Sequence, residues 1–138
     1  MTAPDLLTLA RFVLDRIAED EQTALAAGGR TARGEQITEW RADGMQVVAE
    51  PDETLVVKHS WPREIKHITR HDPAHVLAEL AVRRAAVESF AAWVEDNRFS
   101  LDQQDTHPLE RLVRAWAALD ADHPDYSAEW APSSAGAR

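Results

Sequence analysis

Residues 67–80 read HITRHDPAHVLAEL, and the Asp72-Pro73 pair inside this stretch decides how the second half of the chain folds. The residue before a proline avoids the α-helical region, so a helix is expected to end at this pair. Aspartate is also a favoured N-cap, and proline fits the first turn of the helix that follows. We therefore expect a short helix over residues 62–70 and a long helix from Pro73 to about Asn97.

Apolar side chains recur at helical spacing on both sides of this stretch. Residues 4–27 predict a first helix, which Gly28-Gly29 ends because glycine readily takes the left-handed cap conformation. Residues 108–119 predict a last, shorter helix. The residues expected to face inward are Leu6, Leu9, Val13 and Ile17 in the first helix, and Leu109, Leu112, Val113, Trp116 and Leu119 in the last.

Between the first helix and the Asp72-Pro73 pair the period changes to that of strands. Gln36–Arg41, Met45–Ala49 and Thr54–Lys58 are short and rich in β-branched and aromatic residues. Ala42-Asp43-Gly44 is a tight-turn sequence. Three strands cannot bury both faces of a sheet alone, so a helix must cover one of them. We predict a single α+β domain over residues 1–132, with an N-terminal helix, a small three-stranded antiparallel meander, a long central helix and a shorter C-terminal helix, and a frayed tail over residues 133–138.

Composition limits the classes of function. The 138 residues carry 24 Asp or Glu and 15 Lys or Arg, a formal charge of −9, and no run of basic residues that would track a phosphate backbone. Nucleic-acid binding is therefore disfavoured. There is no cysteine for a disulfide, a thiolate metal site or a nucleophile. The first ten residues hold no Lys or Arg, and no charge-free stretch is long enough to span a membrane. We expect a cytoplasmic protein with no membrane segment.

His67, His71 and His75 are spaced by four, the spacing that puts histidines on one face of a helix and suits metal ligation. The break at Pro73 places His75 on the second helix, so convergence of the three is not guaranteed by spacing. The alternative is that they are surface or capping residues. Asp72 has a sufficient explanation as a cap, although His71, His75 and the amides near Ala74 would also suit a modest anion pocket at a helix N-terminus.

A second group of chemically capable residues lies in ADHPDYSAEW, residues 121–130. His123 between two aspartates has the residue types of an oriented base. The alternative is structural: His123-Pro124-Asp125 forms a turn, and Tyr126 and Trp130, four residues apart, anchor one helical turn onto the core. The five tryptophans suggest an aromatic cluster shared between the meander and the helices. Arg84 is a further candidate contact for an anion, or else part of a solvated helix face.

These motifs also carry a resemblance. HITRHDPAHVLAEL with Arg84, ADHPDYSAEW, and a first helix ending in AEDEQTALAA (residues 18–27) resemble a family of small uncharacterised proteins from Streptomyces, other actinobacteria and their phages. The chain differs from the family pattern where it lacks a Gly-Pro-Trp after the first helix and has His75 for an arginine and Asp120 for a tyrosine. The resemblance implies no assigned activity, cofactor or catalytic residue. The matching positions are His67, His71, Asp72, Pro73, Leu77, Arg84, His123, Pro124, Tyr126 and Trp130.

The sequence favours a non-enzymatic cytoplasmic interaction or accessory module, of actinobacterial or prophage origin, that binds another protein or itself. It contains no phosphate-binding glycine loop, nucleophile elbow or Walker-type lysine, and we expect no cofactor. Two alternatives stay open. One is a metal- or anion-dependent, hydrolase-like activity built on His67, His71 and His75, with His123 nearby. The other is an acidic phage protein that mimics nucleic acid.

Overall fold

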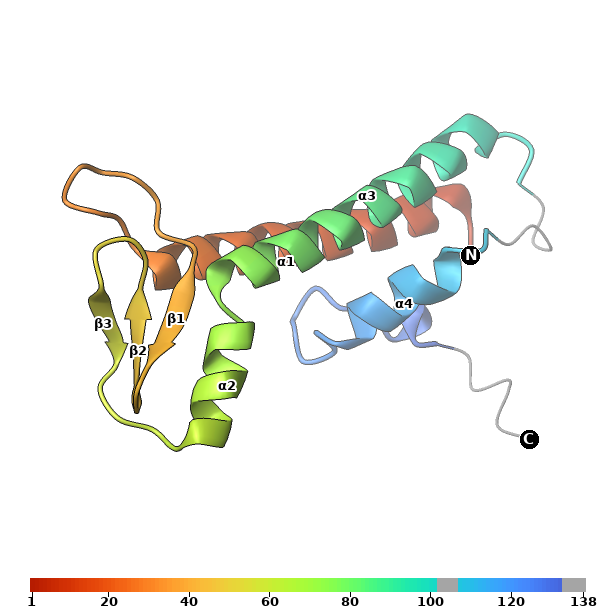
Figure 1. Ribbon diagram of the computed structural model, residues 1–138. Coiled ribbons are helices and arrows are strands. Elements are labelled where there is room, and N and C mark those ends of the chain that lie inside the picture. The colour runs from red at the N-terminus through yellow and green to blue at the C-terminus, as the bar shows by residue number, and fades with distance from the viewer. Residues whose placement is uncertain (102–106, 133–138) are drawn as a thin grey trace. The chain divides into compact units, whose positions relative to one another are not determined.

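The computed structural model describes residues 1–101 and 107–132 (Figure 1). The α+β class and the predicted positions of the helices are confirmed; the predicted tail over residues 133–138 lies outside the described residues. None of the described helices is both long enough and apolar enough to span a membrane. The elements, in chain order, are α1 (Ala3–Gly28), β1 (Trp40–Asp43), β2 (Gln46–Ala49), β3 (Thr54–Val57), α2 (Pro62–Arg70), α3 (Pro73–Asn97), α4 (Glu110–Ala118) and the short 3-10 helix η1 (Ala128–Trp130).

The chain divides into two compact units. Unit 1 comprises Met1–Ala18 and Val82–Arg138, and unit 2 comprises the single stretch Glu19–Ala81. The helices α1 and α3 each contribute one part to unit 1 and the other to unit 2. That residues 1–132 act as one domain stays a prediction.

The core of unit 1 is built from the apolar stripes of its helices. In α1 the predicted inward residues are all buried, and Phe12 joins them. In α3 the fully buried residues fall three or four positions apart, which is the spacing of one helix face. The buried side chains of this core are Leu6, Leu9, Phe12, Val13 and Ile17 from α1, Val87, Phe90 and Val94 from α3, Val113 and Ala117 from α4, and Trp130 from η1.

Two leucines of the last predicted helix are corrected by the structure. Leu112 is 47% exposed and Leu119 is 70% exposed, whereas both were expected to face inward. The buried face of α4 centres on Val113 and Ala117, four residues apart, and Leu112 lies one position away from that face. Leu119 keeps helical dihedral angles, and because it lies two positions beyond Ala117, about 200° further round the helix, it points away from the buried face.

Unit 2 contains an antiparallel sheet in the order β1-β2-β3. Trp40 pairs with Ala49 across β1 and β2, and Ala49 pairs with Thr54 across β2 and β3. In β2, Val47, Val48 and Ala49 are all buried, and because consecutive strand residues point to opposite faces, both faces of the sheet are covered there. The helix α2 packs against β1 and β2, with Ile65 buried, so the predicted helical cover is confirmed (Figure 1).

The first strand begins four residues later than predicted. Residues 36–39 are not part of β1; instead the Ile37 amide donates to the Gly29 carbonyl at 3.0 Å, and Gln36 forms an isolated bridge with Arg30. The hairpin turn is also shifted. Asp43 still pairs with Gln46, so the turn residues are Gly44 and Met45, with only Gly44 at positive φ (61°). Glycine at the first central position is the requirement of a type II′ turn.

The end of α1 explains why residues 36 and 37 are drawn away from the sheet. The Gln36 Nε2 group donates to the Leu25 and Gly29 carbonyls, both at 2.8 Å, in addition to the backbone amides of Gly29 and Ile37 that these two carbonyls accept. Gly28 allows this approach, since a Cβ there would lie 1.7 Å from the Ile37 carbonyl oxygen. The local demands of the helix end therefore override the strand propensity of the sequence.

Candidate functional site

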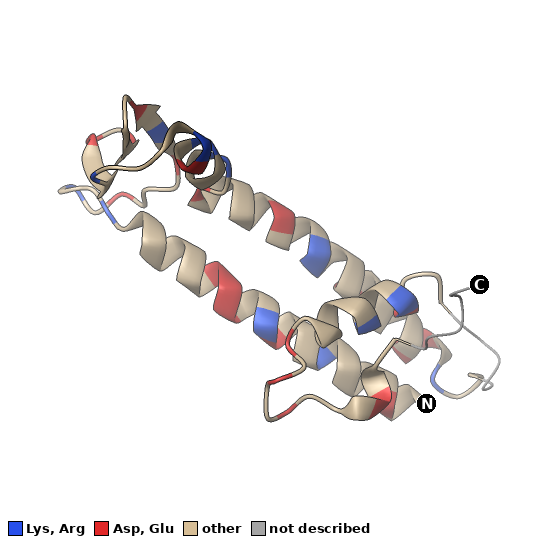
Figure 2. Ribbon diagram, turned by 90° about the horizontal axis from the view of Figure 1, so that it is seen from below, with Lys and Arg blue, Asp and Glu red and all other residues tan. Residues whose placement is uncertain are grey.

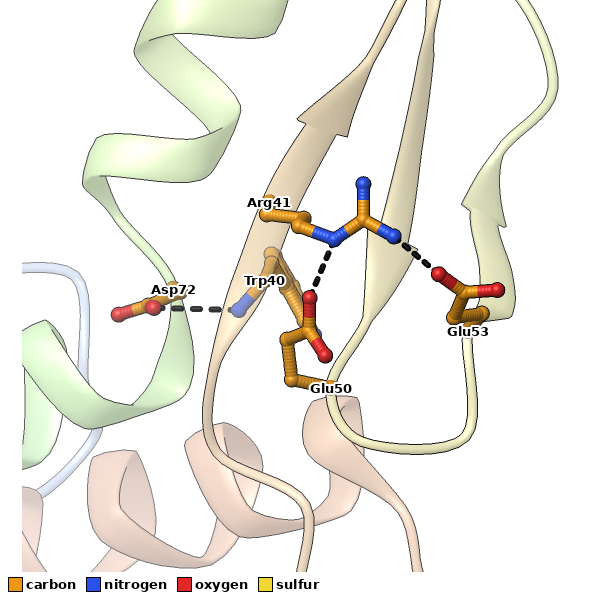
Figure 3. Close-up of polar contacts among 5 residues, drawn as sticks. All are labelled: Trp40, Arg41, Glu50, Glu53 and Asp72. Atoms are coloured by element: carbon orange, nitrogen blue, oxygen red, sulfur yellow. Dashed lines mark hydrogen bonds and ion pairs between the residues drawn. The ribbon is translucent and has the colours of Figure 1, made fainter.

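Asp72 links the start of α3 to the first strand. Its Oδ1 accepts the His75 amide at 2.9 Å, which confirms the predicted N-cap. Its Oδ2 accepts the Trp40 amide at 3.2 Å, a bond across 32 residues that the sequence did not indicate (Figure 3). Because both carboxylate oxygens are engaged by backbone amides, Asp72 holds a helix start and a strand edge in place.

The amides that an anion pocket would use are also engaged. The Ala74 amide donates to the Thr38 carbonyl at 2.8 Å, and the His75 amide donates to Asp72. A helix N-terminus binds an anion through amides that point freely at the ligand. At the start of α3 these two amides already have protein acceptors, so an anion there would have to displace them.

His67, His71 and His75 form a continuous row despite the break at Pro73. The ring centroids of His67 and His71 are 4.4 Å apart, and those of His71 and His75 are 5.8 Å apart. His71 Nδ1 lies 2.9 Å from the His67 carbonyl oxygen, and His75 Nε2 lies 3.3 Å from Glu79 Oε1. All three side chains are exposed, so the row lies on the surface of unit 2.

The row does not amount to a metal centre on geometry alone. Over residues 1–101 and 107–132, no group of three or more His, Asp or Glu side chains is arranged to hold a metal ion. One ring nitrogen of His71, Nδ1, is hydrogen-bonded to the His67 carbonyl. A zinc site needs three or four donor atoms that converge on the metal at about 2 Å. The ring planes of His67 and His71 are tilted by 38°, and His75 meets His71 edge-on at 82°, so the rings contact one another in a row.

The second motif builds part of the core of unit 1. Trp130 is 5% exposed, and its ring centroid lies 5.1 Å from that of Phe12. His123 and Tyr126 meet the same Phe12 ring edge-on, at 5.6 Å and 6.1 Å. Both Tyr126 and Trp130 contact the core as expected, but they do not share one helical turn, since Tyr126 precedes η1 and is half-buried while Trp130 ends it. An edge-to-face cluster of this kind contributes about 0.5–1.5 kcal/mol per pair beyond the area it buries.

His123 also shapes the turn that precedes η1. Its carbonyl accepts the Tyr126 amide at 3.0 Å, and its Nδ1 accepts the Asp125 amide at 3.1 Å. The expected turn at His123-Pro124-Asp125 is therefore confirmed. His123 belongs to unit 1 and His71 to unit 2, and a joint site of the two motifs stays a prediction.

The remaining candidates have local roles. Arg84 lies on the part of α3 in unit 1 and has Glu88 at 4.0 Å, four residues on. The expected shared tryptophan cluster is wrong for Trp61, which is 62% exposed. Its neighbour Pro62 begins α2, so Trp61 precedes the helix and is not carried onto its buried face.

Arg41 joins β1 to the turn between β2 and β3. Its guanidinium forms ion pairs with Glu50 and Glu53 (Figure 3). The hydrogen bond to Glu50 raises the pKa of Arg41 above its usual value. These side chains are well exposed, so the pairs hold the turn and contribute little to the free energy of unfolding.

The outward face of α2 is a feature that none of the sequence motifs indicated. Arg63, Lys66, His67 and Arg70, here called the basic face, are all exposed and occupy positions i, i+3, i+4 and i+7, which lie together on one side of a helix. Ile65, on the opposite side, is buried. Within the described part of the chain, Arg63, Lys66 and Arg70 have no ion-pair partner. The spacing of these residues was the available signal.

The charge of this region is opposite to that of the protein. Residues 58–70 contain four of the 15 Lys or Arg residues and one of the 24 Asp or Glu residues, so their formal charge is +3 while the rest of the chain carries −12. In Figure 2 the blue segments of α2 are seen together with blue and red segments along the other helices. At the start of the helix, Trp61, Pro62 and Arg63 line a pocket of about 470 Å³.

Glu64, the one acid of α2, secures its first turn. It accepts the Trp61 amide at 3.2 Å and the Ser60 hydroxyl, as the glutamate of a capping box does. These bonds, the Ser60 hydroxyl first, hold the pKa of Glu64 below its ordinary value. The carboxylate of Glu64 therefore bonds to Ser60 and Trp61 and holds the first turn of α2, where the basic face begins.

A family model matches residues 7–132, which is nearly the whole chain. The chain belongs to DUF6221, a family of unknown function. No curated protein and no solved structure matches it. Membership of DUF6221 supports the expectation of an uncharacterised domain family and assigns no chemistry to the residues above.

Proposed function

We propose that this DUF6221 protein is a non-enzymatic protein-interaction module that works in the cytoplasm of an actinobacterium or its prophage. The observation that carries the proposal is the basic face of α2, whose three permanent cations have no internal partner among the described residues. Exposed charges of one sign on a rigid helix steer and orient a partner of opposite charge.

The polar groups that a catalytic function would need have structural tasks. Both oxygens of Asp72 bond to backbone amides. His123 packs against Phe12 and accepts an amide, so it is held as part of a turn. The basic face, in contrast, has no structural task on its outer side, which supports binding over catalysis.

The test compares two triple variants of the full chain. Arg63→Ala/Lys66→Ala/Arg70→Ala removes the charges of the basic face, and Arg11→Ala/Arg33→Ala/Arg111→Ala removes three exposed arginines elsewhere. Each tagged protein is used to capture partners from actinobacterial extract, and captured proteins are then purified and rebound. We expect wild type and the second variant to bind the same protein, and the first to bind it at least about tenfold more weakly. Equal binding by both variants would contradict the proposal.

A further inference from the structure

The partner of the basic face is itself present in the sequence. We propose that the basic face of one copy binds the acidic turn of a second copy, where the acidic turn is Leu119–Asp125. This inference rests on the proposed function and names the partner. The turn has the residues LDADHPD, with three aspartates and no Lys or Arg. Figure 2 shows its red segments in the loop after α4.

The acidic turn is presented for contact. The Leu119 residue is 70% exposed and the Asp125 side chain is 80% exposed. Asp122 is exposed as well and has no ion-pair partner among residues 1–101 and 107–132. The backbone beneath is fixed, since the His123 amide donates to the Asp120 carbonyl at 2.9 Å. A preformed turn loses little conformational entropy when it binds.

The two surfaces match in charge, size and apolar content. Arg63 and Arg70 are separated by about 10 Å along the helix axis, at 1.5 Å per residue. Asp122 and Asp125 are three residues apart in a turn, so they lie closer together than the roughly 11 Å that three extended residues would span, and both fit within the length of the basic face. The exposed Leu119 beside the aspartates suits the pocket lined by Trp61 and Pro62 beside the cations. In the proposed contact the three carboxylates of the turn would meet the three permanent cations, and Leu119 would meet Trp61.

A nucleic acid fits the same face less well. Proteins that grip a phosphate backbone commonly use about 6–10 phosphate contacts, whereas the basic face offers three permanent cations over about 10 Å. The acidic turn offers three carboxylates, the same number as the permanent cations of the basic face.

The experiment is a charge swap measured by sedimentation velocity on the full chain. One variant is Lys66→Glu/Arg70→Glu, and the other is Asp122→Lys/Asp125→Lys. The matched controls are Arg33→Glu/Arg111→Glu and Asp52→Lys/Asp96→Lys, which make the same charge changes at exposed positions elsewhere. Protein concentrations run from about 1 µM to about 500 µM, which brackets weak interfaces. Melting curves establish that every variant is folded.

We expect wild type and both controls to associate with rising concentration, and to dissociate when NaCl is raised from about 50 mM to about 500 mM. Each swap variant alone should remain a monomer, with an association constant at least about tenfold lower. An equimolar mixture of the two swap variants should associate again, because each altered surface now meets a complementary one. Restoration in the mixture separates a contact between copies from a loss of folding.

Several results would overturn the inference. One is a wild-type monomer at every concentration, and another is association that both swap variants retain. Binding of a labelled oligonucleotide of about 20 deoxythymidines that Lys66→Glu/Arg70→Glu abolishes, without self-association, would assign the face to nucleic acid instead. If wild type is a monomer but its captured partner still depends on the basic face, the proposed function stands and this inference fails. If neither depends on the basic face, both fail.

Discussion

Histidine lies beside proline in both motif regions, at His71-Asp72-Pro73 in unit 2 and at His123-Pro124 in unit 1. The first histidine is exposed and contacts other histidines, whereas the second packs edge-on against Phe12. The difference comes from the neighbouring residues of each motif. Tyr126 and Trp130 carry the second motif into a core, while the first lies at a helix junction with charged residues around it. Similar residue types therefore lie on the surface in the first motif and pack against the core in the second.

The sharpest way to break this comparison is to remove the core anchor. Trp130→Ala should lower the free energy of unfolding by about 3–5 kcal/mol, because it deletes a buried ring and leaves a cavity beside Phe12. Urea denaturation measures the loss. Trp61→Ala is the control, since an exposed tryptophan should cost less than about 0.5 kcal/mol. Equal losses at the two sites would contradict the contrast between core and surface.

The next largest effect should come from the junction itself. Asp72→Ala removes the acceptor of two backbone amides and should cost about 1–3 kcal/mol. Asp72→Asn retains one acceptor oxygen and should lose less. Asp125→Ala, in the other motif, removes a side chain that is 80% exposed and should leave the urea midpoint almost unchanged. A larger loss for Asp125 than for Asp72 would reverse our account of the two motifs.

Glu64 gives a pH dependence whose sign is fixed. Its pKa is lowered in the folded state, so its contribution to stability is present above its ordinary value of 4.5 and is lost as the pH falls through the lowered value. The stability difference between wild type and Glu64→Gln should therefore shrink as the pH falls below that ordinary value. Urea midpoints of both proteins across this range measure it. A difference that grows toward low pH would show that the hydrogen bonds from Ser60 and Trp61 do not favour the carboxylate.

The smallest effect is expected in the histidine row. His71→Ala should change the free energy of unfolding by less than about 0.5 kcal/mol, since the ring is exposed. Zinc should leave the melting temperatures of wild type and variant unchanged, because the described residues hold no group of three donors arranged around a metal ion. Calorimetry with zinc checks the same point. Stoichiometric binding that His71→Ala abolishes would restore the metal-dependent alternative.

The sequence sufficed for elements whose boundaries are set by local chemistry. Pro62, Pro73 and Gly28-Gly29 mark helix ends through restrictions on their own backbone, and the helices begin and end at or beside them. The buried faces of α1 and α3 follow from the helical spacing of their apolar residues, which is a property of the local sequence. The sequence also allowed the aromatic packing of the second motif to be predicted, because Tyr126 and Trp130 are four residues apart.

Features that depend on distant partners were not accessible in this way. The side chain of Gln36 bonds to the end of α1, which removes residues 36–39 from the strand. Asp72 accepts the Trp40 amide across 32 residues, and no local pattern encodes that pairing. The basic face had a readable spacing, yet it was hidden by the net negative charge of the chain. The net charge is a sum over the whole chain, whereas a partner contacts only one local surface, whose charge can have the opposite sign.

The division of the chain has a consequence for its synthesis. Unit 2 occupies one uninterrupted stretch, so every residue it needs has left the ribosome soon after Ala81. Unit 1 is formed from both ends of the chain, so Phe12 can contact Tyr126 and Trp130 only after the C-terminal segment has been synthesised. Closing such a long loop slows folding and leaves the apolar stripe of the first helix uncovered in the meantime. We expect the nascent chain to carry a formed sheet while its N-terminal segment is still a target for chaperones.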